Sequence, residues 1–232
     1  MSLKIHNIKF AASNSSGEVS GILVLPEKPI FLLLFAHGAG AGMKHPFMEK
    51  ISFLLAGEGV GTLRYNFPYA EKKIKRHDPV PILMQTVRSA VKAAKEYAEG
   101  IPLFAGGKSM GGRMTSMAAS NPDKVGMKSV KGIVFFGFPL HAPGKSSNER
   151  AEHLFNVSIP MLFLQGTRDK LADLKLLKPI IKKLKDTATL HIIEGADHSF
   201  HMLKNSGRSD EEVLKELVKK IKEWSGKIQE NK

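Results

Sequence analysis

The stretch "LFAGGKSMGGRM", residues 103–114, places four glycines around one serine directly after an apolar run. Glycine loses more backbone entropy on folding than any other residue, so this clustering indicates a backbone in a tight corner. Gly107-Lys108-Ser109-Met110-Gly111 matches the G-x-S-x-G pattern. Such a serine needs small neighbours and the N–H groups of a following helix. A strand over 101–107 and a helix over 109–120 would provide that context, whereas a plain glycine-rich turn would require no further catalytic groups.

A serine nucleophile needs a base, and the segment "EGADHSF", residues 194–200, offers His198. It follows the predicted last strand, 188–195, at the end where open α/β sheets place their ligand crevice. A histidine can accept the serine proton and return it to a leaving group. His201 is the competing candidate.

A serine nucleophile and its histidine base also need an acid that orients the histidine ring. The segment "LQGTRDK", residues 164–170, offers Asp169 after the preceding strand. Asp173 and Asp197 are alternatives. Asp173 is more typical of a helix N-cap, and Asp197 is too close in sequence to His198 to orient its ring. The resulting order of serine, aspartate and histidine is that of the α/β hydrolases and differs from those of chymotrypsin and subtilisin.

Acyl transfer also needs N–H donors for the oxygen that becomes negative. We expect one from the backbone of Met110, and the second from the loop "AHGAGAGMKHPFM", residues 36–48, where Ala39 is preferred and Gly40 is the alternative. A phosphate-binding loop is the rival interpretation, but the loop matches neither a P-loop nor a complete G-x-G-x-x-G.

Apolar runs of strand length alternate with helical patterns five times, which predicts a mostly parallel sheet with helices on both faces. The two leading strands, 5–12 and 17–26, should form an antiparallel edge. A Ser-x-x-Glu capping box should open the last helix, residues 209–226. We expect one domain over residues 1–232, because the segment 141–157 has room for a short cap at most.

The composition excludes several classes of protein. There is no cysteine, so the chain has no disulfide, zinc–thiolate site or cysteine nucleophile. No signal peptide or membrane-spanning run is visible, which predicts a cytoplasmic protein without membrane association. The net charge is +13, but acidic residues are interleaved with the C-terminal lysines, so we expect a solvated basic surface and no nucleic-acid partner.

The motifs together resemble the small α/β-hydrolase-fold proteins close to the dienelactone hydrolases. The resemblance spans residues 37–200 and is carried by "HGAGAGMKHPFM", "RYNFPY", "GGKSMGGRM", "FGFPLHAPGK", "LQGTRD" and "GADHSF". It implies serine hydrolase chemistry without a cofactor or a metal. True dienelactone hydrolases use a cysteine nucleophile where this chain has Ser109, which argues against dienelactone as the substrate.

Four further residues are candidates to line the substrate pocket. Tyr69, Phe138 and His141 follow predicted strands at the same rim as Ser109, and His45 lies in the oxyanion loop. Packing around loops is an equally good interpretation for each of them. The basic run over 72–77 is consistent with an anionic substrate, although solvated surface is the simpler interpretation.

These features predict a serine hydrolase that cleaves a small carboxylic ester or thioester through an acyl-enzyme. The alternative is a non-catalytic binding module on a hydrolase scaffold, in a regulatory complex that could include nucleic acid. Only the net charge supports the alternative. The sequence leaves the substrate's acyl-chain length and the oligomeric state open.

Overall fold

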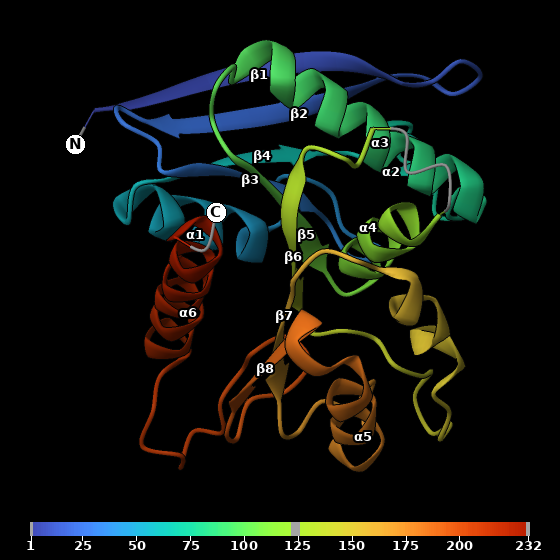
Figure 1. Ribbon diagram of the computed structural model, residues 1–232, viewed down its shortest axis with the longest axis vertical. Helices are drawn as coiled ribbons and strands as arrows, with labels where there is room; N and C mark the ends of the chain where they lie inside the picture. Colours follow the sequence, from blue (N-terminus) through green and yellow to red (C-terminus); the bar gives the residue numbers. More distant parts are fainter. Residues whose placement is uncertain (1, 122–125, 231–232) are drawn as a thin grey trace.

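The computed structural model describes residues 2–121 and 126–230 and contains an eight-stranded sheet between two layers of helices (Figure 1). The strand order is β1-β2-β4-β3-β5-β6-β7-β8. The strands are β1 Leu3–Ser13, β2 Gly17–Pro26, β3 Phe31–Ala36, β4 Val60–Tyr65, β5 Leu103–Lys108, β6 Val130–Phe136, β7 Met161–Gly166 and β8 Ala188–Ile193. The six strands from β4 to β8 in this order are parallel, which confirms the predicted fold class.

The sheet is buried on both faces because its central strands are largely apolar. In β3, Leu32, Leu34 and Ala36 face one core, whereas the alternating residues Phe31 and Leu33 face the other. This alternation follows from the two-residue period of a strand. A continuous apolar run therefore predicts a strand covered by helices on both sides, as observed.

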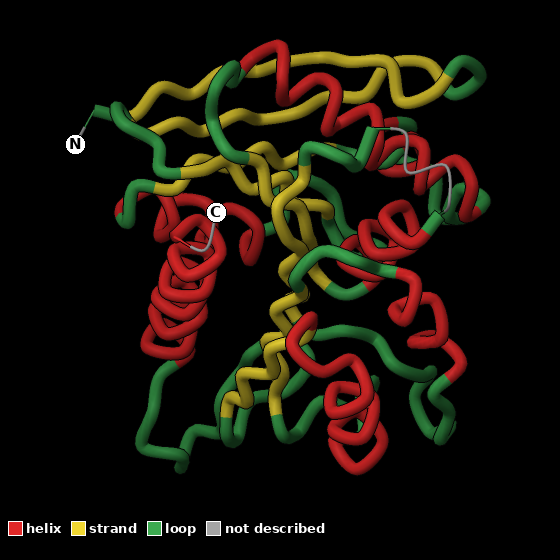
Figure 2. Tube along the Cα trace, viewed as in Figure 1, coloured by secondary structure: helices red, strands yellow, loops and turns green. Residues whose placement is uncertain are grey.

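The helices cover the two faces unequally (Figures 1 and 2). One face is covered by α1 Pro46–Gly57 and α6 Asp210–Glu230. The other is covered by α3 Val80–Tyr97, α4 Met110–Ser120, α5 Leu174–Leu184 and the 3₁₀ helix η1 Glu149–Asn156. Two shorter elements, α2 Pro68–Glu71 and the 3₁₀ turn η2 Lys185–Thr187, complete the described helices.

The N-terminal hairpin forms the edge of the sheet, as predicted. Strand β1 pairs antiparallel with β2, and β2 pairs antiparallel with β4. The pairing leaves one long side of β1 unpartnered, and its first residues are exposed. The hairpin therefore forms one edge of an open sheet, and β8 forms the other.

The predicted helix caps are present. Ser209 and Glu212 exchange hydrogen bonds at the start of α6, and the Asp173 side chain accepts from the Lys175 N–H at the start of α5. Helix α5 contains Pro179 and continues through it. Over residues 141–157 the chain forms loops and η1, with no cap of larger size. Among the described residues, no helix combines the length and the apolar character needed to cross a membrane.

Candidate active site

Ser109 lies in the turn between β5 and α4, with a backbone conformation that side-chain-bearing residues rarely adopt. Its φ is 50° and its ψ is −117°. The turn is held by the Ser109 N–H, which donates to the Phe136 carbonyl at 3.1 Å, and by the Arg113 N–H, which donates to the Ser109 carbonyl at 3.2 Å. Such a conformation costs about 1–3 kcal/mol and persists only where the surroundings enforce it. The serine thus begins the helix in a forced orientation.

The glycines that flank Ser109 are needed for close packing at this turn. A Cβ atom on Gly107 would lie 2.5 Å from the Ala36 carbonyl oxygen, and one on Gly111 would lie 2.4 Å from the same oxygen. A Cβ on Gly106 would lie 2.1 Å from the Val134 carbonyl oxygen. Real Cβ atoms do not approach a backbone atom so closely, so β3 and β6 can pack against this corner only because these residues are glycine.

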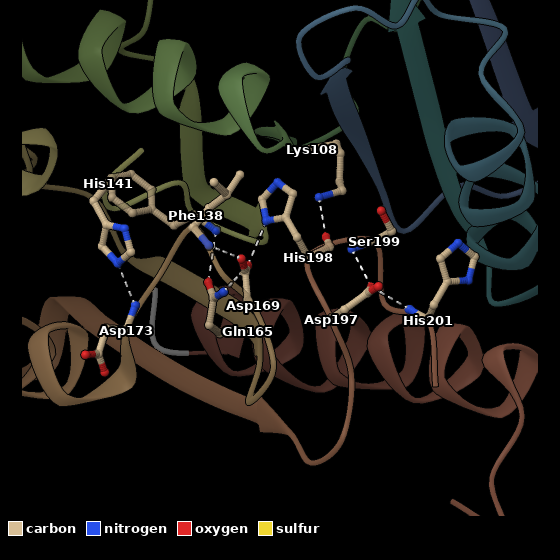
Figure 3. A network of polar contacts seen from close by, with 11 residues as sticks. Lys108, Phe138, His141, Gln165, Asp169, Asp173, Asp197, His198, Ser199 and His201 are labelled. Carbon is tan, nitrogen blue, oxygen red and sulfur yellow. Dashed lines mark hydrogen bonds and ion pairs between the residues drawn. The ribbon is translucent and has the colours of Figure 1, made fainter. Parts of the chain in front are cut away.

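His198 and Asp169 form a hydrogen-bonded pair at the ends of the adjacent strands β8 and β7 (Figure 3). His198 Nδ1 lies 2.7 Å from Asp169 Oδ2, and the Asp169 side chain is completely buried. Because a carboxylate only accepts, Nδ1 carries the proton when the ring is neutral. This tautomer leaves Nε2 of His198 as a proton acceptor.

Two further donors hold the Asp169 carboxylate. Gln165 Nε2 donates to Oδ2, and the Leu171 N–H donates to Oδ1 at 2.8 Å. Gln165 is itself oriented by the Phe138 N–H, which donates to its Oε1 at 3.0 Å. The sequence analysis missed Gln165, although a glutamine inside the otherwise apolar strand β7 is a signal that could have found it.

The alternative acids and base make other interactions. Asp197 accepts hydrogen bonds from the backbone of Ser199 and His201 and so stabilises its own turn (Figure 3). His201 pairs with Asp210 at 2.6 Å, and two thirds of its side chain is exposed. Asp173 caps α5. The structure thus brings together Asp169 and His198 rather than these alternatives.

Ser109 and His198 line the same cavity, which has a volume of about 530 Å³. In the described part of the chain, no hydrogen bond within 3.5 Å joins the Ser109 hydroxyl to His198. Such bonds are often long before substrate arrives and tighten in the reacting complex. The cavity is lined on its other sides by the oxyanion loop, by Phe47 and Met48 of α1, and by residues near the start of α6.

The expected oxyanion loop lies next to Ser109. A Cβ placed on Gly38 would be 3.7 Å from Ser109 Cβ, and Ala39 lines the cavity. Within the described residues, the Ala39 N–H donates to no backbone carbonyl. Gly40, the alternative donor, is not among the residues that line this cavity and instead borders a second pocket with Tyr69. This placement favours Ala39 over Gly40 as the second donor.

Two buried side chains hold this loop in place. His37 Nδ1 lies 2.8 Å from the Gly38 carbonyl, while its Nε2 accepts from the Phe67 N–H at 3.1 Å. Burial lowers the pKa of His37 to about 4, so the ring is neutral and Nδ1–H donates to Gly38. The Tyr69 hydroxyl also donates to the Gly38 carbonyl, at 3.5 Å, and burial raises the pKa of Tyr69 to about 12.

Three of the four residues predicted to line the pocket do not reach it. Tyr69 supports the oxyanion loop from the far side, and Phe138 is fully buried against Phe135. The His141 ring accepts the Asp173 N–H at 2.9 Å and anchors the start of α5. His45 does line the cavity, and its Nδ1 also caps α1 by accepting from the Phe47 N–H. Among the described residues, no group of three or more potential metal ligands is gathered at one place.

Comparison with known proteins places this geometry in a family. A family model described as an alpha/beta hydrolase domain matches residues 29–226. The fold is similar to that of a dienelactone hydrolase from Anabaena variabilis, with a TM-score of 0.71, 19% identity, and coverage of 94% of this chain and 97% of that chain. It is also similar to an α/β serine hydrolase without a lid from Xanthomonas campestris, with a TM-score of 0.74, 16% identity, and coverage of 95% of both chains.

The relatives found by sequence have names that suggest a different activity from those of the structural neighbours. The chain is 26% identical, over 186 residues, to two Mycobacterium tuberculosis proteins that are provisionally named phosphoribosyl transferases. The match covers 78% of this chain and 39% of those relatives, so the chain spans well under half of their length. The structural similarities establish the fold, and the family match extends across the strands and loops that carry Ser109, Asp169 and His198. The chain therefore belongs to the α/β-hydrolase family.

Proposed function

We propose that the protein is a serine hydrolase that cleaves a small carboxylic ester or thioester. The observation that carries the proposal is the strained Ser109 in one cavity with His198, whose other ring nitrogen is bonded to the buried Asp169. A protein that only binds a ligand has no need for a serine held in a conformation that costs free energy.

The proposed reaction begins with attack of Ser109 Oγ on the acyl carbon while His198 Nε2 accepts the hydroxyl proton. Asp169 holds the ring in the required tautomer and stabilises the imidazolium that forms. The N–H groups of Met110 and Ala39 donate to the oxyanion of the tetrahedral intermediate.

Collapse of this intermediate breaks the bond to the leaving alcohol or thiol, which takes the proton from His198. The acyl group is then bound to Ser109. Water, activated by the same histidine, attacks this acyl-enzyme and releases the carboxylic acid. The chemistry uses side chains and backbone groups of this chain alone.

The test is hydrolysis of p-nitrophenyl esters and acyl thioesters of increasing chain length by the purified protein. We expect Ser109→Ala to lower kcat/KM at least about 10⁴-fold while leaving the fold intact, because it deletes only a hydroxyl. Unchanged hydrolysis by the folded variant would overturn the assignment of the nucleophile. A folded wild type without activity on any ester would favour the non-catalytic binding module.

A further inference from the structure

Lys108 immediately precedes Ser109 and directs its side chain toward the loop that carries His198. Its Nζ donates to the His198 carbonyl oxygen at 2.6 Å (Figure 3). The ammonium lies beside two stacked aromatic rings, 5.9 Å from the centroid of Phe47 and 5.7 Å from that of Phe200. Both distances are within the range of cation–π attraction. One side chain thus connects the residue before the nucleophile with the backbone of the base.

This lysine has no carboxylate partner in the described part of the chain. Within the described residues it takes part in no ion pair, and the charges of Asp169 and Asp197 act on it only from a distance. Burial lowers the pKa of Lys108 to about 8. A half-buried cation without an ion-pair partner is unfavourable, so a simple packing role would be performed better by an apolar side chain.

The opposite wall leaves space for both groups. Gly137 has a φ of 72°, and a Cβ there would lie 3.3 Å from Lys108 Nζ and 3.3 Å from the His198 ring. A side chain at Gly137, directly after β6, would crowd the ammonium and the imidazole, so the glycine helps them to lie side by side.

We propose that Lys108 is a positioning residue, which fixes the backbone of His198 relative to Ser109 and so sets the reach of the imidazole to the nucleophile. The proposal rests on the proposed function. The hydrogen bond from Lys108 ends on the His198 carbonyl itself. Loss of this bond would therefore let the imidazole shift while the rest of the loop stays folded. Misplacement of a catalytic group by about 1 Å can lower a rate by about 10²-fold.

The first experiment compares Lys108→Met with Lys170→Met on a neutral p-nitrophenyl ester. Lys170 is an exposed lysine beside Asp169, so its loss changes the net charge equally. We expect Lys108→Met to lower kcat about 10- to 100-fold with KM within about threefold. We expect Lys170→Met to keep both constants within about twofold. A rise in KM alone would overturn the proposal, because Lys108 would then act on the substrate.

A pH profile separates positioning from simple structural support. The charged groups around the ammonium are Asp169 after β7, and Asp197 and His198 after β8. Lys50 of α1, and His45, His201 and Asp210 line the same cavity. We expect wild-type kcat to fall above about pH 8 as Lys108 loses its charge, and Lys108→Arg to retain activity at higher pH because arginine stays protonated.

If Lys108→Met fails to fold, the rate at which a fluorophosphonate labels Ser109 in the wild type still tests the proposal. A rate that falls above about pH 8 in the wild type but not in Lys108→Arg supports it, and a fall that Lys108→Arg shares overturns it. Hydrolysis that survives Ser109→Ala would overturn the proposed function and the positioning role together. Hydrolysis that is lost in Ser109→Ala but normal in Lys108→Met would overturn the positioning role alone.

Discussion

The turn into helix α4 and the helix itself carry two serines that each lie near a histidine. Ser116, inside the helix, has its hydroxyl 2.8 Å from Nε2 of His153 in η1. Ser109, at the N-terminal end, shares a cavity with His198, and no hydrogen bond between their side chains is formed in the described structure. On hydrogen bonding alone, the inner pair looks more like a nucleophile and its base.

The surroundings of the two pairs instead favour Ser109 and His198 as the nucleophile and its base. Ser116 is fully buried in a regular helix, and its single proton can also be donated to the Arg113 carbonyl at 2.9 Å. Burial, together with the charge of the nearby Arg113, lowers the pKa of His153 to about 4. His198 instead has the Asp169 carboxylate on its other nitrogen. Access, an orienting acid and a strained backbone therefore distinguish Ser109, the proposed nucleophile, from the structural Ser116.

The largest expected difference between the two pairs lies in the histidines. We expect His198→Ala to lower kcat/KM about 10³- to 10⁴-fold, because the serine loses the acceptor for its proton. His153→Ala should keep kcat/KM within about threefold, since Ser116 reaches no substrate. Steady-state hydrolysis of one short-chain ester by both folded variants measures this, and similar losses would remove the distinction.

The second largest expected effect is a loss of stability at the strained turn that holds Ser109; Ser116 lies in a regular helix and has no such strain. A Cβ on Gly107 would lie 2.5 Å from the backbone of β3, so Gly107→Ala forces two central strands apart. We expect a loss of about 2–4 kcal/mol in the free energy of unfolding, measured in urea. Gly226→Ala is the matched control, because a Cβ there meets no atom within 4 Å and α6 should gain about 0.5–1 kcal/mol.

A control that loses as much stability as Gly107→Ala would contradict this account of the corner. So would a Gly107→Ala protein with wild-type stability and kcat, because the glycine would then have no steric role.

The smallest expected effect is a pH dependence of the free energy of unfolding, caused by His153 in its pair with Ser116. The pKa of His153 is about 4 in the folded protein and about 6.5 in an unfolded chain, so the unfolded state binds the proton first as the pH falls. This contribution to stability is complete above pH 6.5 and is lost between pH 6.5 and 4, by about 1–3 kcal/mol.

His153→Gln should therefore flatten the curve of unfolding free energy against pH over this interval. His37, whose pKa is also lowered to about 4, should maintain part of the slope. An unchanged slope in the variant would show that the pKa of His153 does not differ between the folded and unfolded states.

The sequence predicted the fold because local patterns decide most of it. Continuous apolar runs identified the buried strands, and the Ser209 capping box and the Asp173 cap marked helix starts correctly. The loops that follow parallel strands must meet at one edge of the sheet, which is why His198 and Asp169 could be paired from positions 29 residues apart.

Side-chain direction beyond the strand ends could not be predicted in the same way. Phe138 follows Gly137, whose positive φ turns the chain, and the ring enters the core instead of the cavity. Tyr69 and Lys108 act across loops that are distant in sequence, through contacts with Gly38 and His198. Such contacts depend on the packing of several elements at once, which no local pattern encodes.

The most direct test of the central claim is covalent labelling of the folded protein with a fluorophosphonate probe, followed by mass spectrometry to locate the adduct. The account predicts one adduct on Ser109, absent from Ser109→Ala and undiminished in Ser116→Ala. An adduct on Ser116, or no adduct on a protein shown to be folded, would contradict the claim that Ser109 is the activated serine.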